Sequence, residues 1–267
     1  MTPNQFLLAA LIGFVAGILG GLAGIGGSMI MIPGLALVFG YATAEHTEQH
    51  LYMAAAMTIN IVVSLPAAWR HHRKGAMRRD LVAGILPAMV AAIVLGVLIS
   101  NYVEGTLLRR GLAVFIGAYA ALNLFRVILP GGEGDRRPER TGRRRLMAIG
   151  SAAGFVGGLL GLGGGVVMVP LLQVFAHVRL RHAIAASSAV MVISATIGAA
   201  LKMGTLESTH GLSWRDAMAY VVAMAPGAVL GGMLGAQLAH ALPLRVVRGT
   251  VSVLLLLIAL RLGIHPD

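Results

Sequence analysis

The sequence predicts an all-α integral membrane protein built from two homologous halves, and three observations lead to this fold class. Hydrophobic residues make up 57% of the 267 residues and charged residues only 12%, about half the charged share of a typical soluble domain. Residues 5–44, 81–103 and 217–244 contain no charged side chain, and about 20 apolar residues suffice for a helix to cross the hydrocarbon core. A glycine-rich apolar segment also occurs twice, 137 residues apart.

The repeated segment reads GILGGLAGIGGSMIMIP over residues 17–33 and GFVGGLLGLGGGVVMVP over residues 154–170. The two copies align without a gap, with Gly17 opposite Gly154 and Pro33 opposite Pro170. A hydrophobic segment that is interrupted by glycines and followed by proline, at matching positions in two halves, indicates the binding site of a transporter.

Four apolar segments fall in each half, and a polar linker separates the halves. They lie at 5–41, 51–69, 81–103, 107–129, 146–176, 183–203, 215–240 and 246–263. The linker has turn residues, a run of charges and no apolar face, which is typical of a solvated loop. We therefore expect a first transmembrane repeat at 1–129, a basic cytoplasmic linker at 130–145 and a second transmembrane repeat at 146–267.

Two topologies fit the first segment of each half. Residues 5–41 would form a helix about 55 Å long, whereas the hydrocarbon core is only about 30 Å thick. Either the long segments tilt and protrude, which gives eight simple spans, or each breaks at its glycines into two half-helices that enter and return on one side. The second interpretation makes the halves inverted, and segment length and glycine content favour it. Charge does not decide, because the inverted topology places 16 of the 21 Lys and Arg residues inside and eight simple spans place 15.

Several classes of function are disfavoured. The chain has no cysteine, which excludes disulfide and thiol chemistry. Its net charge of +11 comes from Lys and Arg in short loops, as expected of a membrane protein and not of a nucleic-acid binder. The first apolar run lacks a basic region before it, so we interpret it as structure and not as a cleaved signal peptide. All ten Asp and Glu residues fall in loops or at segment ends, which disfavours a cation transporter or a carboxylate-driven proton pump.

The glycines have two expected roles. The cluster just before each proline should open the helix, because exposed N–H groups and the positive end of a half-helix suit an anion. The earlier glycines, spaced four apart from Gly13 and from Gly150, should pack helices together.

Polar side chains within the apolar segments offer donors to an oxyanion, or alternatively hydrogen bonds between helices. These are Thr58, Asn60, Ser64, Asn123, Gln173, Ser187, Ser188, Ser194 and Thr196. The adjacent Ser187 and Ser188 are the preferred ligands because they lie one segment after a glycine break. Arg70 and Lys202 end equivalent segments, and we interpret them as interfacial anchors in preference to anion-attracting entrances.

The doubled glycine motif, the V/I-x-V/I-P sequence that follows it and the Ser-Ser helix after that resemble the TauE/SafE sulfite-exporter family over nearly the whole chain. The resemblance implies an inner-membrane permease, a secondary transporter that exports sulfite, an organosulfonate or a related small sulfur oxyanion by alternating access. The substrate-binding residues carried over from the family motif are Gly24, Gly26, Gly27, Ser28, Pro33, Gly161, Gly163, Gly164, Gly165, Pro170, Ser187 and Ser188.

The first half departs from this motif, because Ala55 and Ala56 stand where the second half has Ser187 and Ser188. We therefore expect the site to rest mainly on the second half. The alternatives are an anion channel of the same fold and, less favoured, a membrane-embedded enzyme, which needs carboxylates, a metal cluster or a nucleophile–base pair in the membrane. We expect no enzymatic activity, cofactor or metal. The expected partners are a small anionic substrate and the lipid bilayer, with a homodimer as a candidate assembly and no nucleic acid.

Overall fold

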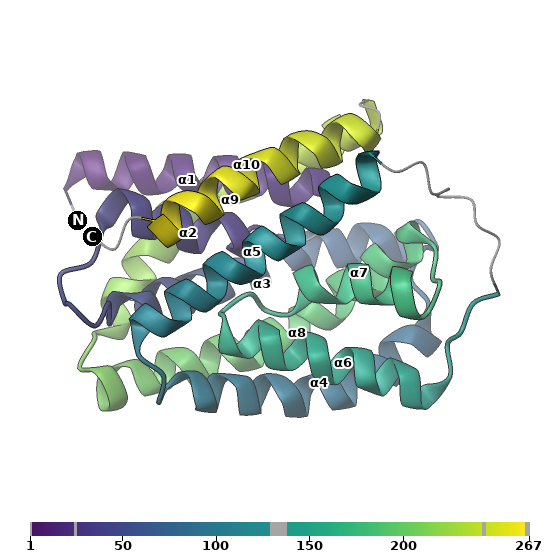
Figure 1. Cartoon of the computed structure of the whole chain (residues 1–267), viewed down its shortest axis with the longest axis horizontal. Coiled ribbons are helices and arrows are strands. Elements are labelled where there is room, and N and C mark those ends of the chain that lie inside the picture. The colour runs from purple at the N-terminus through teal and green to yellow at the C-terminus, as the bar shows by residue number, and fades with distance from the viewer. Residues whose placement is uncertain (1, 24–25, 129–137, 242–243, 265–267) are drawn as a thin grey trace.

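The computed structural model describes residues 2–23, 26–128, 138–241 and 244–264. Within these ranges the chain forms α-helices and no strand (Figure 1). The helices are α1 (Pro3–Ala23), α2 (Ser28–Phe39), α3 (Glu48–Arg73), α4 (Arg79–Ser100), α5 (Gly105–Ile128), α6 (Arg143–Leu159), α7 (Gly165–Phe175), α8 (Leu180–His210), α9 (Trp214–Ala241) and α10 (Leu244–Ile264).

Six of these helices, α1, α3, α4, α5, α8 and α9, are long and apolar enough to cross a membrane. Their outward surface is also apolar: Leu7 is 70% exposed, Val114 73% and Val222 59%. Large apolar side chains spread around the whole helical body are typical of a surface that contacts lipid. The all-α membrane fold class is confirmed.

The loops gather at two opposite ends of the molecule. At one end Thr106 N donates to Glu45 O (3.1 Å), and the rings of His50 and His210 stack with centroids 3.7 Å apart. We call this the acidic end because its surface carries Glu45, Glu48, Glu104, Glu207 and Asp216. At the other, the linker end, Arg140 N donates to Ala176 O (2.9 Å) and Arg181 Nη2 donates to Lys74 O (2.9 Å).

Each broken helix returns to the end from which it started. The start of α1 and the loop after α2 both lie at the left of Figure 1, which is the acidic end. At the linker end, Arg145 near the start of α6 donates to the carbonyl of Phe175 at the end of α7 (3.2 Å). The two pieces are unequal, because α1 has 21 residues and α2 only 12, about 31 and 18 Å long. Thus α1 is more than the half-helix that the sequence suggested.

Glycines hold two pairs of helices in close contact. A Cβ atom on Gly13 or Gly17 of α1 would collide with the backbone of Met224 or Ala228 on α9. A Cβ on Gly150, Gly154 or Gly158 of α6 would collide with carbonyl oxygens of α4. The expected packing role of these glycines is confirmed. Each pair joins one helix from the first half to one from the second, so the halves interlock.

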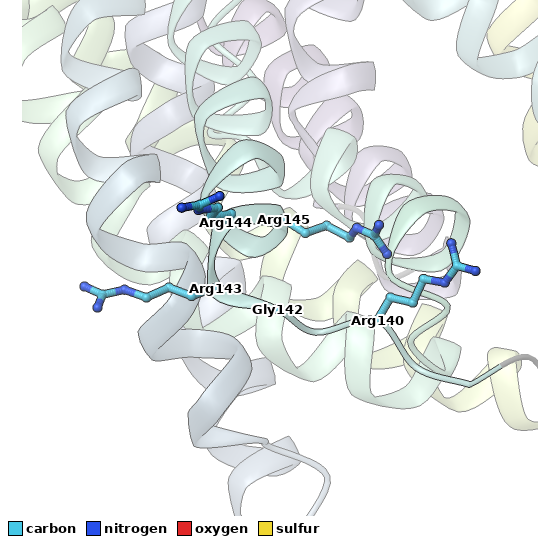
Figure 2. Close-up of a pocket in the computed structure, with 5 residues that line it drawn as sticks. All are labelled: Arg140, Gly142, Arg143, Arg144 and Arg145. Carbon is cyan, nitrogen blue, oxygen red and sulfur yellow. The ribbon is translucent and has the colours of Figure 1, made fainter.

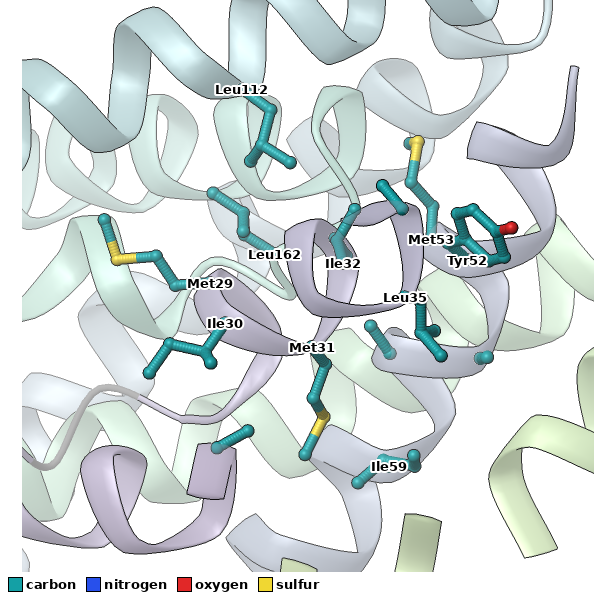
Figure 3. Close-up of a cluster of buried hydrophobic side chains, with 14 of the residues drawn as sticks. Met29, Ile30, Met31, Ile32, Leu35, Tyr52, Met53, Ile59, Leu112 and Leu162 are labelled. Carbon is teal, nitrogen blue, oxygen red and sulfur yellow. The ribbon is translucent and has the colours of Figure 1, made fainter. Parts of the chain in front are cut away.

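The short helix α2 forms the centre of the main apolar core. Its Met29, Met31, Ile32 and Leu35 are fully buried, and Figure 3 shows them among side chains of α3, α5 and the break between α6 and α7. A helix that is apolar on every side and only 12 residues long is stable only inside protein. The burial of α2 places its first turn deep in the molecule.

Candidate functional site

Both glycine motifs coincide with helix breaks. The first residues of α2 and α7, Ser28 and Gly165, are equivalent in the repeat. The residues before them, Gly27 and Gly164, occupy the N-cap positions, and neither helix start has a side-chain cap. Both starts are buried. A buried helix start without a capping partner leaves backbone N–H groups unsatisfied.

The breaks require glycine for backbone reasons. Gly26 and its equivalent Gly163 have φ of 79° and 68°, the left-handed region that side chains rarely adopt. The repeat is not exact, because Gly164 has φ 83° and its equivalent Gly27 has φ −92°. Gly161 is also left-handed, while its equivalent, Gly24, lies outside the described residues.

Four polar side chains donate hydrogen bonds to backbone carbonyls at the second break. Leu162 O, in the second break, accepts hydrogen bonds from Ser28 Oγ (3.1 Å) and from Asn60 Nδ2 of α3 (3.3 Å). Ser194 Oγ of α8 donates to Gly163 O (3.1 Å), and Ser187 Oγ donates to Gly165 O (3.2 Å). We call Ser28, Asn60, Ser187 and Ser194, together with the glycines that they contact, the polar centre.

The polar centre is closed to solvent. All four polar side chains are 0–1% exposed. Met191 of α8 fills the space between the breaks: a Cβ on Gly26 would lie 3.3 Å from its Cε, and one on Gly165 would lie 2.5 Å from its Sδ. The structure is therefore occluded at this point.

The polar centre suits an anion. The uncapped starts of α2 and α7 supply backbone N–H groups and partial positive charge. None of the Asp and Glu residues in the described ranges is buried, so no carboxylate there opposes an anion. The site offers backbone and neutral side-chain donors without a cation.

The remaining predicted residues lie elsewhere. Ser188 Oγ bonds back to Ile184 O of its own helix (2.9 Å). Pro33 and Pro170 are the sixth residues of α2 and α7, about 8 Å along the helix from its start. Asn60 and Ser194 reach the centre although the sequence singled them out only as polar residues in apolar segments, and nothing in the sequence marked Met191.

The two basic residues that end equivalent segments differ sharply. Arg70 is exposed at the linker end, as an interfacial anchor should be. Lys202 is 0% exposed and bonds to residues of α3, of the end of α4 and of the turn that follows it. The interpretation of Lys202 as an anchor is wrong for this structure, since its ammonium does not reach the surface.

A basic hollow lies at the linker end, away from the polar centre. It measures about 560 Å³ and is lined by Arg140, Gly142 and the three arginines that follow (Figure 2). Nearby, Arg78 forms ion pairs with Asp80 and Glu139, and its hydrogen bond to the Asp80 carboxylate, followed by that to Glu139, raises the pKa of the guanidinium. Even with these acids, cations dominate this surface.

The fold and the site define a multi-pass α-helical membrane protein with two broken helices whose starts meet at a buried polar centre. The family model described as Sulfite exporter TauE/SafE matches residues 9–262. The chain therefore belongs to the TauE/SafE sulfite exporter family, whose members are named as membrane transporters and not as enzymes.

Named relatives extend this result. The probable membrane transporter protein MamO of Magnetospirillum gryphiswaldense is 26% identical over 94% of this chain, which corresponds to 44% of that protein. The probable membrane transporter protein YunE of Bacillus subtilis is 22% identical over 97% of both chains. MJ0441 of Methanocaldococcus jannaschii, named in the same way, is 24% identical over 72% of this chain and 70% of its own length. The chain thus spans less than half of MamO, and no solved structure matches it.

Proposed function

We propose that this protein is a secondary transporter that exports a small sulfur oxyanion, sulfite or an organosulfonate, across the inner membrane by alternating access. The observation that carries the proposal is the meeting of two buried, uncapped helix starts at Leu162 and Asn60, with no buried carboxylate in the described residues. Helix starts bind oxyanions through backbone N–H groups. The sulfite-exporter name of the family supports the choice of substrate.

The proposed substrate-binding residues are those of the polar centre and the glycines of both breaks. Ser28, Ser187 and Ser194 now donate to backbone carbonyls, and in the proposed open state these hydroxyls turn to the anion. Asn60 is the proposed ligand from the first half, because the side chains of Ala55 and Ala56 cannot form hydrogen bonds. At the offset that pairs His50 with His182, Asn60 pairs with Val192, so the proposed site is asymmetric.

The proposed topology is an inverted repeat with the linker in the cytoplasm. The first broken helix returns to the acidic end and the second to the linker end, and three helices, α3, α4 and α5, connect them. The linker end carries at least ten Lys and Arg residues from Arg70 to Arg181, and such loops face the cytoplasm in membrane proteins. We divide the chain into repeats at 1–129 and 146–267 on this basis.

The occlusion of the polar centre favours a carrier over a channel of the same fold. A channel needs a continuous wet path, whereas here Asn60 and Ser194 have no exposed surface and Met191 lies between the breaks. An occluded site is an expected state of an alternating-access cycle, in which both repeats close around the substrate.

Flux measurements test the proposal. We expect proteoliposomes containing the purified protein to show saturable efflux and counterflow of labelled sulfite, with competition by sulfoacetate and weaker competition by chloride. Flux that rises linearly with concentration would indicate a channel, and no flux of any anion through folded protein would refute the proposal.

The absence of cysteine makes topology directly testable. Glu104 at the acidic end and Arg140 at the linker end are both exposed, so each can be replaced by a single cysteine. In intact cells, an impermeant maleimide should label the first variant and not the second. The reverse pattern would contradict the proposed orientation without affecting the substrate assignment.

A further inference from the structure

A buried lysine near the acidic end lies outside the polar centre. Lys202 Nζ donates to Ser100 Oγ (2.9 Å) and Asn101 Oδ1 (2.7 Å), and lies 2.8 Å from His50 Nδ1. All three contacts are to neutral groups. In the described part of the chain, no Asp or Glu forms an ion pair with this lysine.

The N–H groups of the Lys202 ammonium have hydrogen-bond acceptors, but no carboxylate of the described residues neutralises its charge. Ser100 Oγ donates its own proton to Val97 O (2.8 Å), and Asn101 Nδ2 donates to Thr205 Oγ1 (3.0 Å). Both residues therefore present only lone pairs to Lys202. Burying a cation without a counter-charge is costly, and an ionisable residue in this position within a membrane protein is a candidate functional group.

A second buried donor lies beside the lysine. The ring of His210 stacks on that of His50 with an interplanar angle of 15°, and His210 Nε2 is buried without a hydrogen-bond partner. An unpartnered ring nitrogen next to an uncompensated ammonium is an arrangement that an anion can complete. We call Lys202, His50, His210, Ser100 and Asn101 the lysine cluster.

The same two helices carry the lysine cluster and the polar centre. On α3, His50 precedes Asn60 by ten residues, and on α8 Lys202 follows Ser194 by eight. These separations correspond to about 15 Å and 12 Å along the helices. An anion that leaves the polar centre between α3 and α8 toward the acidic end reaches Lys202 before it meets the surface carboxylates.

We propose that the lysine cluster is a second binding site for the transported oxyanion, located between the polar centre and the acidic end. This inference rests on the proposed function as an anion transporter. When the acidic end opens, the anion replaces the Ser100 and Asn101 oxygens at the ammonium, and His210 Nε2 donates a further hydrogen bond. The cluster thus gives an outgoing anion an attractive position just beneath a surface that repels it.

Three variants separate charge from packing. Lys202→Gln keeps N–H donors for Ser100 and Asn101 but removes the charge, while His210→Phe keeps the stack on His50 but removes the donor. Arg215→Gln is the matched control, because it removes a cation from the same end at an exposed position. The measurements are the half-saturation constant for sulfite efflux from proteoliposomes and the increase in Tm that sulfite causes in the purified protein.

Loss of a charge-assisted contact should raise the half-saturation constant of Lys202→Gln at least about tenfold and reduce the sulfite-dependent increase in Tm. His210→Phe should raise the constant about threefold, and Arg215→Gln should stay within about twofold of the wild type. Wild-type values for Lys202→Gln would overturn the second site and leave the proposed function intact. If that variant does not fold, an unchanged constant for His210→Phe would overturn it. A wild-type protein without flux or Tm response to sulfite would instead refute both proposals.

Discussion

Placing a carboxylate in the polar centre gives the sharpest test of anion binding there. Asn60→Asp is nearly isosteric, and Asn60 Oδ1 lies 3.3 Å from where a Cβ of Gly26 would be, so an anion held at this break would lie close to the new charge. Two charges about 4 Å apart repel by about 4 kcal/mol at an effective dielectric constant of about 20. We therefore expect about a thousandfold loss of sulfite affinity, measured as efflux from proteoliposomes.

Two further variants control for other effects of this substitution. Asn60→Ala removes the hydrogen bond to Leu162 O without adding charge, and because Ser28 still donates to that carbonyl, the stability cost should be about 0.6 kcal/mol. Asn123→Asp places a carboxylate on α5, where the native amide bonds only to its own helix at Tyr119 O (2.8 Å), and should keep normal flux. Sulfite affinity of folded Asn60→Asp within twofold of Asn60→Ala would refute an anion site at this position.

The other predictions concern the glycine breaks and the serines. Gly164→Ala forces a side chain into φ 83° at a cost of about 1–2 kcal/mol, so Tm should fall by a few degrees. Flux should fall further than this loss of stability accounts for, whereas full flux would show that the break tolerates a Cβ. Ser187→Ala should raise the half-saturation constant while Ser188→Ala, whose hydroxyl bonds its own helix, should not, and equal effects would contradict the assigned roles. Gly154→Leu should prevent the packing of α6 against α4, seen as loss of the monodisperse peak in size-exclusion chromatography. The control Gly204→Ala should elute normally, because a Cβ there would have nothing within 4 Å. A monodisperse Gly154→Leu protein would contradict the packing argument.

Much of the fold could be predicted because hydrophobicity and glycine spacing are local signals. Each apolar segment became a helix or a broken pair of helices, and both breaks fall at the repeated glycine motif. What the sequence could not give was the unequal length of the pieces, since α1 continues for 21 residues before it ends. Glycine permits a break but does not determine at which of several positions the helix stops.

The site was predictable only in part, because it depends on which face each helix turns inward. Ser187 and Ser188 are adjacent in sequence, yet one hydroxyl reaches the polar centre and the other bonds within its helix. The sequence did not distinguish Asn60 from the other polar residues in the apolar segments. Only the packing of α3 shows that it lies between Gly26 and Gly163. Lys202 looked like an ordinary segment end, because its burial depends on Ser100 and Asn101, which lie about 100 residues earlier in the chain.

The glycine contacts between helices also bear on how such a molecule can move. At Gly17 against α9 and at Gly154 against α4, backbone touches backbone, and the nearest atoms leave no space for a methyl group. Close-packed interfaces of this kind resist sliding, so α1 with α9 should travel as one rigid body and α4 with α6 as another. Each body combines one helix from either half of the sequence, and α3 and α8 run between them. The hinges are then expected along α3 and α8. Cleaving the chain at the linker would separate the two halves of the sequence but not the two rigid bodies.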